Sequence, residues 1–450
     1  MKVSYNWIKD YTKITATPEQ MDQILTDTGL EVEGVTKVES VKGGLAGVVV
    51  GHVLTCEKHP DADKLRVTTI NVGTEEPLQI VCGAPNVAAG QKVIVATVGT
   101  TLYPKPEEAF KIKLSKIRGV ESAGMLCAED ELGLGHSHDG ILVLPEDTQV
   151  GLPASVYFGL EDDYEIEIGL TPNRADAMGH VGVVRDYVAY ENVHNNAGLT
   201  IDWPEVNAFD AQVNEKPIEI TIEDSELCPK YAGIVLTGVK VEPSPSWMQN
   251  RLRVVGIQPI NNIVDATNYV MRELGTPLHA FDYDKLNGKI VVKKATKDAA
   301  FVTLDGVERK LGENNLMITN GTEDLCIAGV YGGLNSGVSD QTTTIFLESA
   351  YFNPVSVRKT AREHGLNTDA SFRFERGVDP SLTKYALQRV ASIIAEIAGG
   401  KQASNLIEIG EMEQTRIVEF NVDRGNRLIG IQLSKEDTVK ILANLDIRVI

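Results

Sequence analysis

The first clear pattern of hydrophobic and polar positions is a helical one near the N-terminus. Met21, Ile24 and Leu25 recur at helical spacing and would form one apolar stripe. Residues 17–20 (TPEQ) place an N-cap threonine, a proline at the first helical position and a capping-box glutamine before the stripe. Gly29 stands where glycine often ends a helix. The pattern predicts a helix that begins at this proline and ends before Gly29.

From residue 43 to about residue 153 the pattern changes to short runs of β-branched and apolar residues. Gly, Pro and Asn separate the runs, as they separate the strands of a small closed or partly closed barrel. The strands are predicted at 47–54, 65–72, 78–81, 92–98 and 110–117.

The rest of the chain mixes helix and strand patterns. An alternating run at 165–168 leads into a predicted helix, and the polar segment 195–217 is typical of a linker. Further strands are predicted at 218–222, 232–241 and 417–422. Helices are predicted over 246–253, 261–274, 381–398 and 434–445, and Ser246, Ser381 and Ser434 are the expected N-caps. The last pattern stops midway at Ile450, so we expect this sequence to be a truncated one.

Composition narrows the class of protein. A chain of 450 residues predicts about three domains, and 42% hydrophobic with 24% charged residues excludes global disorder. The five cysteines are scattered and never spaced as CxxC, which argues against a disulfide scaffold or a cysteine zinc site and fits a reducing cytosol. No apolar run reaches the roughly 18 residues of a membrane helix. The formal charge of −20 argues against coating nucleic acid by bulk charge, although local basic faces remain compatible with it.

Three motifs in the strand-rich region point to RNA. They are HPDADKLRV at 59–67, IVCGAPN at 80–86 and IRGVESAGMLCA at 117–128. Their order and spacing resemble the EMAP-type oligonucleotide-binding barrel, an OB-fold found in tRNA-binding proteins; a barrel kept only for packing is the alternative. A local cationic edge fits a groove that follows single strands. The residues of this basic edge are Lys105, Lys111, Lys113, Lys116 and Arg118.

The region after residue 218 carries no familiar hydrolase motif. There is no GxSxG or HExxH string, and the Gly-rich run 328–335 lacks the Gly-Lys-Ser/Thr of a phosphate loop. Four other strings stand out: 256–270 (GIQPINNIVDATNYV), 275–282 (GTPLHAFD), 345–352 (IFLESAYF) and 368–379 (TDASFRFERGVD). Together with the barrel motifs they resemble the β subunit of bacterial phenylalanyl-tRNA synthetase, over essentially the whole chain.

The resemblance implies a multidomain α+β architecture. A small α+β domain would be discontinuous, formed by residues 1–39 and 153–200, with the EMAP-type OB-fold barrel inserted at 40–152. A mixed α/β editing domain of the B3/B4 type would follow at 201–400. Residues 401–450 would begin a DNA-binding-like, B5-like domain that is cut short.

The resemblance also assigns roles in hydrolysing tyrosine wrongly attached to phenylalanine tRNA. A pocket for phenylalanine rejects tyrosine weakly, so a second sieve must favour the phenol. Glu348 matches the residue that binds the phenolic hydroxyl; its alternative is an exposed strand-end charge or a salt bridge with Arg358 or Arg362. His279 and Asn268 match positions around the ester and a water. The remaining substrate-binding positions are Gly332, Gly333, Thr368, Ala370 and Gln258, the last replacing an expected Arg or Lys.

The resemblance implies partners as well. The family works as an α2β2 heterotetramer in the cytoplasm, with ATP, magnesium and aminoacylation belonging to the α subunit and tRNA(Phe) as the shared ligand. No metal site, cofactor or membrane contact is expected in this chain. Arg358, Lys359, Arg362, Arg373 and Arg376 are candidates for phosphate contacts. Two other functions stay open: a scaffold for RNA or a partner subunit with a degenerate pocket, and a metal-independent hydrolase of small esters.

Overall fold

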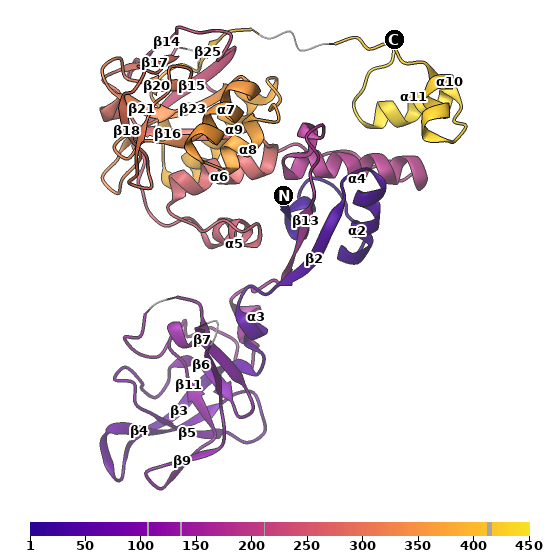
Figure 1. The fold of residues 1–450 in the computed structure, drawn as a ribbon. Helices are drawn as coiled ribbons and strands as arrows, with labels where there is room; N and C mark the ends of the chain where they lie inside the picture. The colour runs from indigo at the N-terminus through magenta and orange to yellow at the C-terminus, as the bar shows by residue number, and fades with distance from the viewer. Residues whose placement is uncertain (106–107, 136, 211, 412–415) are drawn as a thin grey trace. The chain divides into compact units, whose positions relative to one another are not determined.

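The computed structural model describes residues 1–105, 108–135, 137–210, 212–411 and 416–450. The chain forms two compact units, and each is described by itself. The first unit comprises Met1–Thr36 and Tyr164–Ile450, and the second comprises Lys37–Asp163. The chain therefore leaves the first unit near residue 37 and returns to it near residue 164 (Figure 1).

The first unit begins with a small sheet in the order β1-β13-β2, whose middle strand comes from the returning chain. In β13, residues Glu165, Ile166 and Glu167 pair antiparallel with residues 4, 3 and 2 of β1. The elements here are β1 (Lys2–Ser4), α1 (Tyr5–Ile8), α2 (Pro18–Asp27), β2 (Val32–Val38), β13 (Asp163–Ile168), the 3-10 turn η3 (Ala175–Ala177) and α4 (His180–His194).

Helix α2 confirms the predicted start and stop signals. Thr17 caps the helix in a capping box with Gln20, and Gly29 follows with φ +86°, which favours glycine. Met21, Ile24 and Leu25 are buried. Local sequence alone therefore specified this element.

The second unit is a barrel-like sheet in the order β11-β6-β3-β4-β5, with β12 also on β6. The amide of Ala123, which precedes β11, donates to the Gln79 carbonyl of β5 over 2.8 Å, so the two ends of the sheet approach each other. The elements are the 3-10 turns η1 (Lys42–Leu45) and η2 (Asp130–Leu132), helix α3 (Ala154–Tyr157), and the strands β3 (Val48–His59), β4 (Ala62–Asn71), β5 (Leu78–Cys82), β6 (Lys92–Thr97), β7 (Thr101–Lys105), β8 (Glu108–Lys111), β9 (Ser115–Ile117), β10 (Val120–Ser122), β11 (Gly124–Leu126) and β12 (Val143–Leu144).

The predicted single strand at 110–117 is wrong. The structure divides it between β8, which forms a hairpin with β7, and β9, which forms a hairpin with β10. Between them Ile112 is buried and its amide donates to the Thr100 carbonyl over 2.8 Å. This inward anchor interrupts the run of exposed residues and separates the two hairpins.

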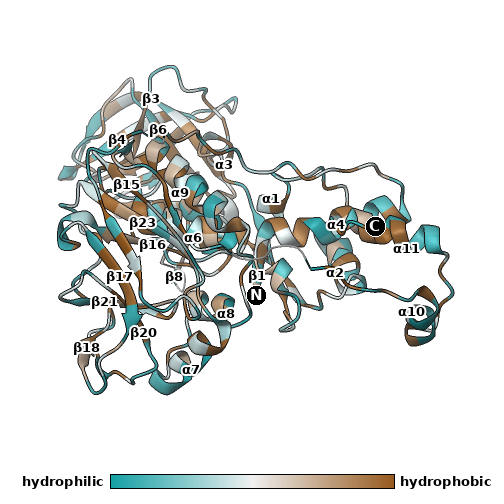
Figure 2. Cartoon of the chain, turned by 90° about the horizontal axis from the view of Figure 1, so that it is seen from above, coloured by the Kyte–Doolittle hydropathy of each residue, from teal (hydrophilic) through white to brown (hydrophobic). Residues whose placement is uncertain are grey.

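The remainder of the first unit contains two five-stranded sheets, ordered β14-β17-β20-β21-β22 and β16-β23-β15-β24, with β25 also pairing β15. Figure 2 shows hydrophobic colour on part of these strands, for example on β17. Helix α6 contacts β16, and helix α9 contacts β15 and β23. The strands are β14 (Glu219–Ile222), β15 (Lys230–Thr237), β16 (Leu278–Asp282), β17 (Lys289–Lys294), β18 (Ala300–Val302), β19 (Glu308–Lys310), β20 (Leu316–Thr319), β21 (Asp324–Ile327), β22 (Tyr331–Gly332), β23 (Thr344–Tyr351), β24 (Lys401–Gln402) and β25 (Ile407–Ile409).

The helices of this part cover the sheets, and the two side-chain N-caps predicted for them, at Ser246 and Ser381, are wrong. Asn261 caps α6, although the sequence pattern did not single it out as a cap, and Gly275 ends this helix with φ +82°. Ser246 is instead the first residue of α5, and the Ser381 hydroxyl bonds Asp379 rather than capping α9. The helices are α5 (Ser246–Val254), α6 (Asn262–Leu274), the 3-10 turn η4 (Tyr283–Lys285), α7 (Pro354–His364), α8 (Asp369–Phe374) and α9 (Leu382–Ala398).

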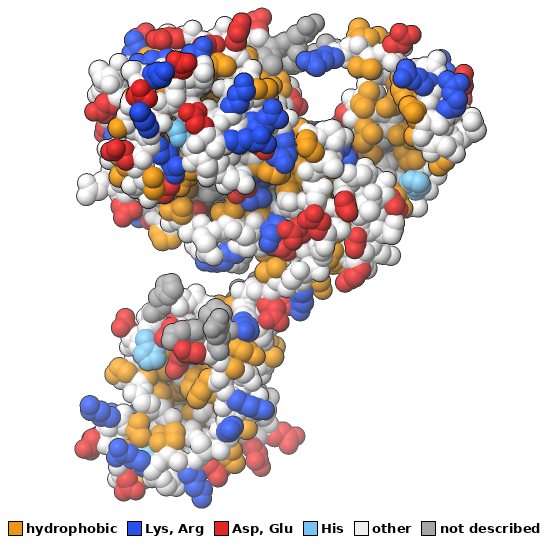
Figure 3. Space-filling view, viewed as in Figure 1, with side chains coloured by type: hydrophobic (Ala, Val, Ile, Leu, Met, Phe, Trp, Pro, Cys, Tyr) orange, Lys and Arg blue, Asp and Glu red, His pale blue; other side chains and the backbone are white. Residues whose placement is uncertain are grey.

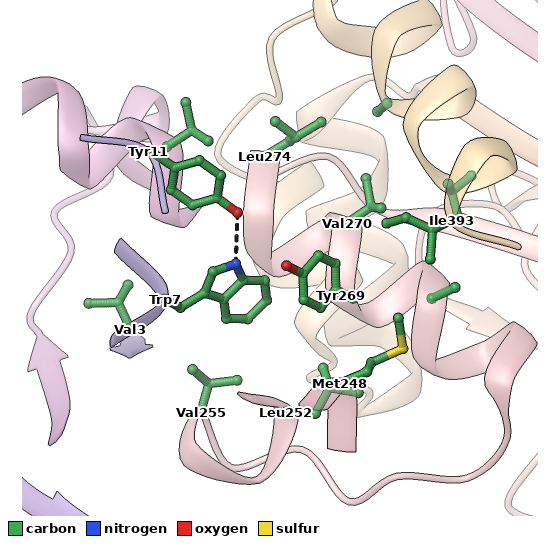
Figure 4. Close-up of a cluster of buried hydrophobic side chains, with 14 of the residues drawn as sticks. Val3, Trp7, Tyr11, Met248, Leu252, Val255, Tyr269, Val270, Leu274 and Ile393 are labelled. Atoms are coloured by element: carbon green, nitrogen blue, oxygen red, sulfur yellow. Dashed lines mark hydrogen bonds between the residues drawn. The ribbon is translucent and has the colours of Figure 1, made fainter. Parts of the chain in front are cut away.

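A buried aromatic cluster joins the first residues of the chain to α5 and α6 (Figure 4). The Trp7 ring stacks on Tyr269 with 4.3 Å between centroids, and its Nε1 donates to Tyr11 Oη over 2.7 Å. Tyr11 in turn donates to Glu273 on α6 over 2.8 Å, and Arg389 pairs with the same carboxylate. The small N-terminal sheet therefore shares one core with the sheet formed by β16, β23 and β15, whereas β17, β20 and β21 of the other sheet belong to a second core.

The last described helices are α10 (Val422–Ile429) and α11 (Lys435–Asn444). Ser434 caps α11 as predicted. The strand predicted at 417–422 is wrong, because residues 416–421 have no regular structure and Val422 begins α10, whose N-cap is Asn421. Within the described residues, no helix combines the length and the apolar character needed to cross a membrane.

Candidate functional site

A pocket of about 230 Å³ lies where β16, β22 and β23 meet α6 and α8. Residues predicted from separate strings of the sequence meet in its wall, and they come from all five of these elements. They are Asn268, His279, Gly332, Glu348, Thr368 and Ala370.

The register of three strands places the two ionisable side chains side by side. Glu348 of β23 pairs with His279 of β16 on one side and with Gly233 of β15 on the other. Directly opposite residues of antiparallel strands point to the same face of a sheet, with Cβ atoms about 4.5–5.5 Å apart. The carboxyl group and the imidazole are therefore neighbours on the pocket face.

Glu348 is a buried acid with a single hydrogen-bond partner among the described residues. Glu348 is only 5% exposed. Its Oε2 accepts a hydrogen bond of 2.5 Å from Tyr231 Oη. Burial raises the pKa of Glu348 to about 7, while the Tyr231 hydrogen bond lowers it. Neither an exposed strand-end charge nor a salt bridge to Arg358 or Arg362 describes this residue in the structure.

His279 carries a free nitrogen at the pocket. Its Nε2 is buried without a hydrogen-bond partner among the described residues, and its ring packs edge-on against Phe281 with 4.4 Å between centroids. Burial lowers the pKa of His279 to about 4, so the imidazole is neutral near pH 7. A neutral imidazole in this position can exchange a hydrogen bond with a ligand or a water.

Helix α8 supplies another wall of the pocket. The Thr368 hydroxyl caps this helix by accepting from the Ser371 amide over 3.0 Å, and it donates to the Val330 carbonyl over 3.0 Å. Its hydrogen-bonding capacity is thus used by the fold. Ala370 leaves space because it carries only a methyl group.

The two glycines that the sequence pairs have different surroundings. A Cβ on Gly332 would lie 2.9 Å from Leu304 Cδ1 and 3.4 Å from His279 Cε1, inside the pocket. A Cβ on Gly333 would instead lie 2.6 Å from the Leu325 backbone oxygen, and Gly333 lines a different hollow, beside Phe301. The missing side chain of Gly332 therefore enlarges the pocket. The missing side chain of Gly333 allows its backbone to lie close to Leu325 in the neighbouring strand.

Gln258 is not part of this pocket wall. It lies exposed in the segment between α5 and α6. Asn268 is half-buried on α6 and does line the pocket. The sequence string that contains both residues therefore contributes one of them to the pocket.

The pocket can bind and orient a ligand but has no evident nucleophile among its described residues. Burial holds the pKa of Cys326 well above its usual value, which keeps the thiol protonated. The Thr368 hydroxyl is already engaged. No group of three His, Cys, Asp or Glu residues that could hold a metal ion occurs in the described ranges. Hydrolysis here would rely on an oriented water.

Two residues of the site were missed by sequence reasoning. Tyr231 contacts Glu348 from a neighbouring strand, and only the rule that a buried phenol needs a partner could have singled it out. Asp369 lines the pocket and accepts from Arg272 over 2.9 Å and from Arg373 over 3.1 Å. Arg373 is fully buried and also donates to the Met178 carbonyl, so it is not an accessible phosphate contact.

The basic edge lies on both hairpins of the barrel unit. Lys111 is at the end of β8, Lys113 follows it, and Lys116 lies on β9 opposite Glu121. Arg118 follows β9 and donates to the Asp61 carbonyl over 3.2 Å. All four are exposed, and Figure 3 shows basic side chains on this unit interspersed with acidic ones. The side chain of Lys105 lies outside what the structure describes.

Two domain families match the chain. The B3/4 domain matches residues 227–399, and the "Putative tRNA binding domain" matches residues 48–153. The phenylalanine–tRNA ligase beta subunit of Bacteroides fragilis (strain YCH46) is 52% identical over 451 residues, covering 100% of this chain and 55% of that protein. The chain is homologous to phenylalanine–tRNA ligase β subunits along its whole length.

A second phenylalanine–tRNA ligase beta subunit, from Geobacillus kaustophilus (strain HTA426), is 45% identical over 456 residues, covering 99% of this chain and 55% of that protein. The chain thus spans about half the length of the curated relatives it matches. An N-terminal fragment of the phenylalanyl-tRNA synthetase β-subunit from Pyrococcus horikoshii matches with a TM-score of 0.30 and 15% identity, covering 63% of this chain and 77% of that one, a likeness too low to carry weight. The pocket lies inside the B3/4 range and the basic edge inside the tRNA-binding range.

Proposed function

We propose that this chain contributes tRNA binding and hydrolytic editing to a phenylalanine–tRNA ligase, and that it releases tyrosine from mischarged Tyr-tRNA(Phe). The observation that carries the proposal is the buried Glu348 carboxyl, which is hydrogen-bonded through one oxygen and lines the pocket. A desolvated carboxyl favours a ligand with a hydroxyl group, because an apolar ligand would leave it without a second partner. Tyrosine supplies that hydroxyl and phenylalanine does not.

The reaction that this pocket can support is attack by water on the ester. A water oxygen would add to the ester carbonyl carbon, the bond to the terminal ribose oxygen would break, and that oxygen would leave as a hydroxyl with the proton from water. His279 Nε2 and the Asn268 amide are the groups available to orient the water and the ester. Gly332 and Ala370 provide the space that the aromatic ring requires.

Tyrosine binding would be selective because the pocket contains a buried carboxylate, Glu348, that has lost most of its hydration. Burial raises the pKa of Glu348 to about 7, so near neutral pH a large fraction of the carboxyl is ionised in apolar surroundings. A phenolic hydroxyl that donates to this carboxylate replaces part of the lost hydration. The gain is specific to tyrosine, as a hydrogen bond to a charged group is worth roughly 1.5–3 kcal/mol.

The barrel would guide tRNA rather than select the amino acid. Exposed Lys111, Lys113, Lys116 and Arg118 can neutralise backbone phosphates, and Lys105 belongs to the same proposed set. Charge contacts of this kind carry no information about which amino acid is attached. Gly333 and Gln258 remain proposed substrate-binding residues, although neither of them lines the pocket.

The homology supports a wider assembly, which belongs to the same proposal. The chain would act in the cytoplasm with a catalytic α subunit in an α2β2 heterotetramer, which would bind ATP, magnesium and tRNA(Phe). The proposed domains are 1–39 with 153–200, an inserted OB-fold at 40–152, an editing domain at 201–400 and the start of a B5-like domain at 401–450.

Deacylation of purified Tyr-tRNA(Phe) tests the function directly. This chain and the assembled ligase should release tyrosine, and Phe-tRNA(Phe) should be hydrolysed much more slowly. Detectable binding of tRNA without release by either protein would contradict editing and favour the scaffold. Cleavage of a tyrosyl methyl ester at a comparable rate without tRNA would contradict it in favour of a general ester hydrolase.

A further inference from the structure

Tyr231 lies in the right place to donate a hydrogen bond to the Glu348 carboxyl. Tyr231 pairs with Ala350 in the antiparallel register of β15 and β23, so it is the diagonal neighbour of Glu348 on the same face. Diagonal neighbours are about 7–8 Å apart at Cα, within reach of a tyrosine and a glutamate side chain. The 2.5 Å hydrogen bond from Tyr231 Oη to Glu348 Oε2 spans this diagonal.

The contact is buried. Tyr231 is 0% exposed, and its phenol is buried together with the carboxyl oxygen it binds. Gly233 lies opposite Glu348 in the register, two residues after Tyr231, and a Cβ at Gly233 would lie 2.3 Å from the Phe346 ring. The missing side chain leaves room for Phe346 to pack against β15.

We propose, on the basis of the editing function above, that Tyr231 is a positioning residue for tyrosine selectivity: its phenol holds one oxygen of Glu348 and leaves the other as the acceptor for the tyrosyl hydroxyl. The Glu348 carboxyl would thus bind two phenols, that of Tyr231 through one oxygen and that of the substrate tyrosine through the other. Tyr231 does not line the pocket.

The same hydrogen bond sets the charge of the acceptor. It stabilises the ionised form of Glu348 and lowers a pKa that burial alone raises. The titratable groups that face Glu348 are Tyr231 on β15, His279 on β16, Cys326 on β21, Cys228 just before β15, and Tyr331 and Asp369 across the pocket. None of these described groups is a cation that could pair with the carboxylate near pH 7. Burial raises the pKa of both thiols and of the Tyr231 phenol, so the thiols stay protonated and Tyr231 stays neutral.

Replacing Tyr231 with phenylalanine tests the proposal with a minimal change of shape. In Tyr231→Phe the pKa of Glu348 should rise by roughly 1 unit, because a hydrogen bond to the charged form is lost. The ratio of kcat/KM for Tyr-tRNA(Phe) over Phe-tRNA(Phe) should then fall about fivefold at pH 7. When this ratio is plotted against pH, the midpoint of its rise should move to higher pH. Phe-tRNA(Phe) corrects for any general change in ester hydrolysis.

Tyr283→Phe is the matched control. It also removes one phenol hydrogen bond, 2.8 Å to the Pro217 carbonyl, in the same part of the chain but away from the pocket. It should leave the selectivity ratio and its midpoint unchanged. A fall of equal size in this control would assign the effect to general loosening and overturn the proposal.

A double-mutant cycle separates positioning from packing. In a Glu348→Gln background position 348 carries no carboxyl that Tyr231 could influence, so adding Tyr231→Phe should shift neither the selectivity ratio nor its pH dependence. An equal further loss in that background would overturn the proposal. The carboxyl titration of Glu348, measured by infrared difference spectroscopy against Glu348→Gln, must also move upward in Tyr231→Phe whether or not turnover is observed.

The outcomes distinguish this proposal from the function on which it rests. Normal release of tyrosine with an unmoved ratio and an unmoved carboxyl titration in Tyr231→Phe overturns the role of Tyr231 and leaves editing intact. Absence of tyrosine release by the wild-type ligase overturns editing, and the role of Tyr231 in selectivity with it.

Discussion

Glu348 in the pocket and the lysines of the basic edge have charges of opposite sign and lie in opposite surroundings. Glu348 is 5% exposed, and neighbouring strands set its only hydrogen bond among the described residues. Lys111, Lys113 and Lys116 are exposed on two hairpins, where water and salt surround them. A buried group acts through a few fixed contacts of high energy, whereas exposed groups act through many weak and screened ones. The two regions should therefore respond very differently to substitution, pH and salt.

The largest expected effect comes from removing the buried charge. Glu348→Gln should lower the ratio of kcat/KM for Tyr-tRNA(Phe) over Phe-tRNA(Phe) about 100-fold, because the tyrosyl hydroxyl loses a charged acceptor in a dry pocket. Deacylation kinetics with both tRNAs measure it, and Glu313→Gln, an exposed glutamate, should behave as wild type. An unchanged ratio in a folded Glu348→Gln protein would contradict the role of Glu348 in selecting tyrosine.

The next effect is on stability and depends on pH. The pKa of Glu348 rises from 4.5 to about 7 on folding, so between these values the native state holds a proton that the unfolded state releases. The free energy of unfolding contributed by Glu348 therefore falls as pH rises through this window, by about 2–3 kcal/mol. Urea unfolding should show Glu348→Gln gaining that much over wild type between pH 4.5 and pH 8.

His279 does not disturb this measurement. Burial lowers its pKa to about 4, which makes the folded protein gain stability as pH rises from about 4 to 6.5. The same slope should occur in wild type and in Glu348→Gln, so it cancels in the difference. A difference between the two proteins that is constant with pH would mean that Glu348 is not a titrating buried acid.

The two adjacent glycines should separate activity from stability. In Gly332→Ala the new methyl group points toward His279 and the flexible, exposed Leu304, so tyrosine release should fall about tenfold while the midpoint of thermal unfolding changes little. In Gly333→Ala the methyl meets the Leu325 backbone oxygen at 2.6 Å, so unfolding should become easier by about 1–3 kcal/mol. Equal losses of activity in both variants at a temperature where both are folded would contradict the assignment of Gly332 to the pocket.

The smallest effects belong to the basic edge. Each of Lys111→Ala and Lys113→Ala should weaken binding of tRNA(Phe) roughly threefold at moderate salt and make it less salt-dependent, without changing the kcat for tyrosine release. Lys116→Ala should do less, since Lys116 already faces Glu121. Filter binding across a salt series checks this, with the exposed Lys13→Ala as control. A change in tyrosine selectivity in these variants would contradict the proposal that the basic edge binds tRNA without selecting the amino acid.

Most of the fold's local signals could be predicted from the sequence. The caps at Thr17 and Ser434 and the end of α6 before Gly275 depend on contacts within a few residues, so tertiary structure had little to add. The failures occur where distant contacts intervene. Ile112 turned inward and divided a predicted strand. The 417–422 run alternates like a strand, but the cap at Asn421 starts a helix instead.

The site follows the same division. Glu348, His279 and Gly332 were expected from motifs, yet their chemistry depends on a strand register that joins residues about 70 positions apart in the chain. Tyr231 and Asp369 carried no distinctive signal, since a tyrosine in an apolar strand and an aspartate at a helix start are common. Arg373 looked like a surface charge in the sequence and is in fact fully buried beside Asp369.

The sequence by itself determined which family this chain resembles, where most helices begin and end, and which residue types are available for the proposed binding of a phenol and a tRNA. Only the tertiary structure decided that the Glu348 carboxyl is buried and that Tyr231 holds one of its oxygens. It also decided that the His279 imidazole is neutral and that its Nε2 has no hydrogen-bond partner among the described residues. The physical reason is that caps and periodicity act over a few residues. Desolvation and hydrogen bonding in a pocket arise only when β15, β23 and β16 meet in one register.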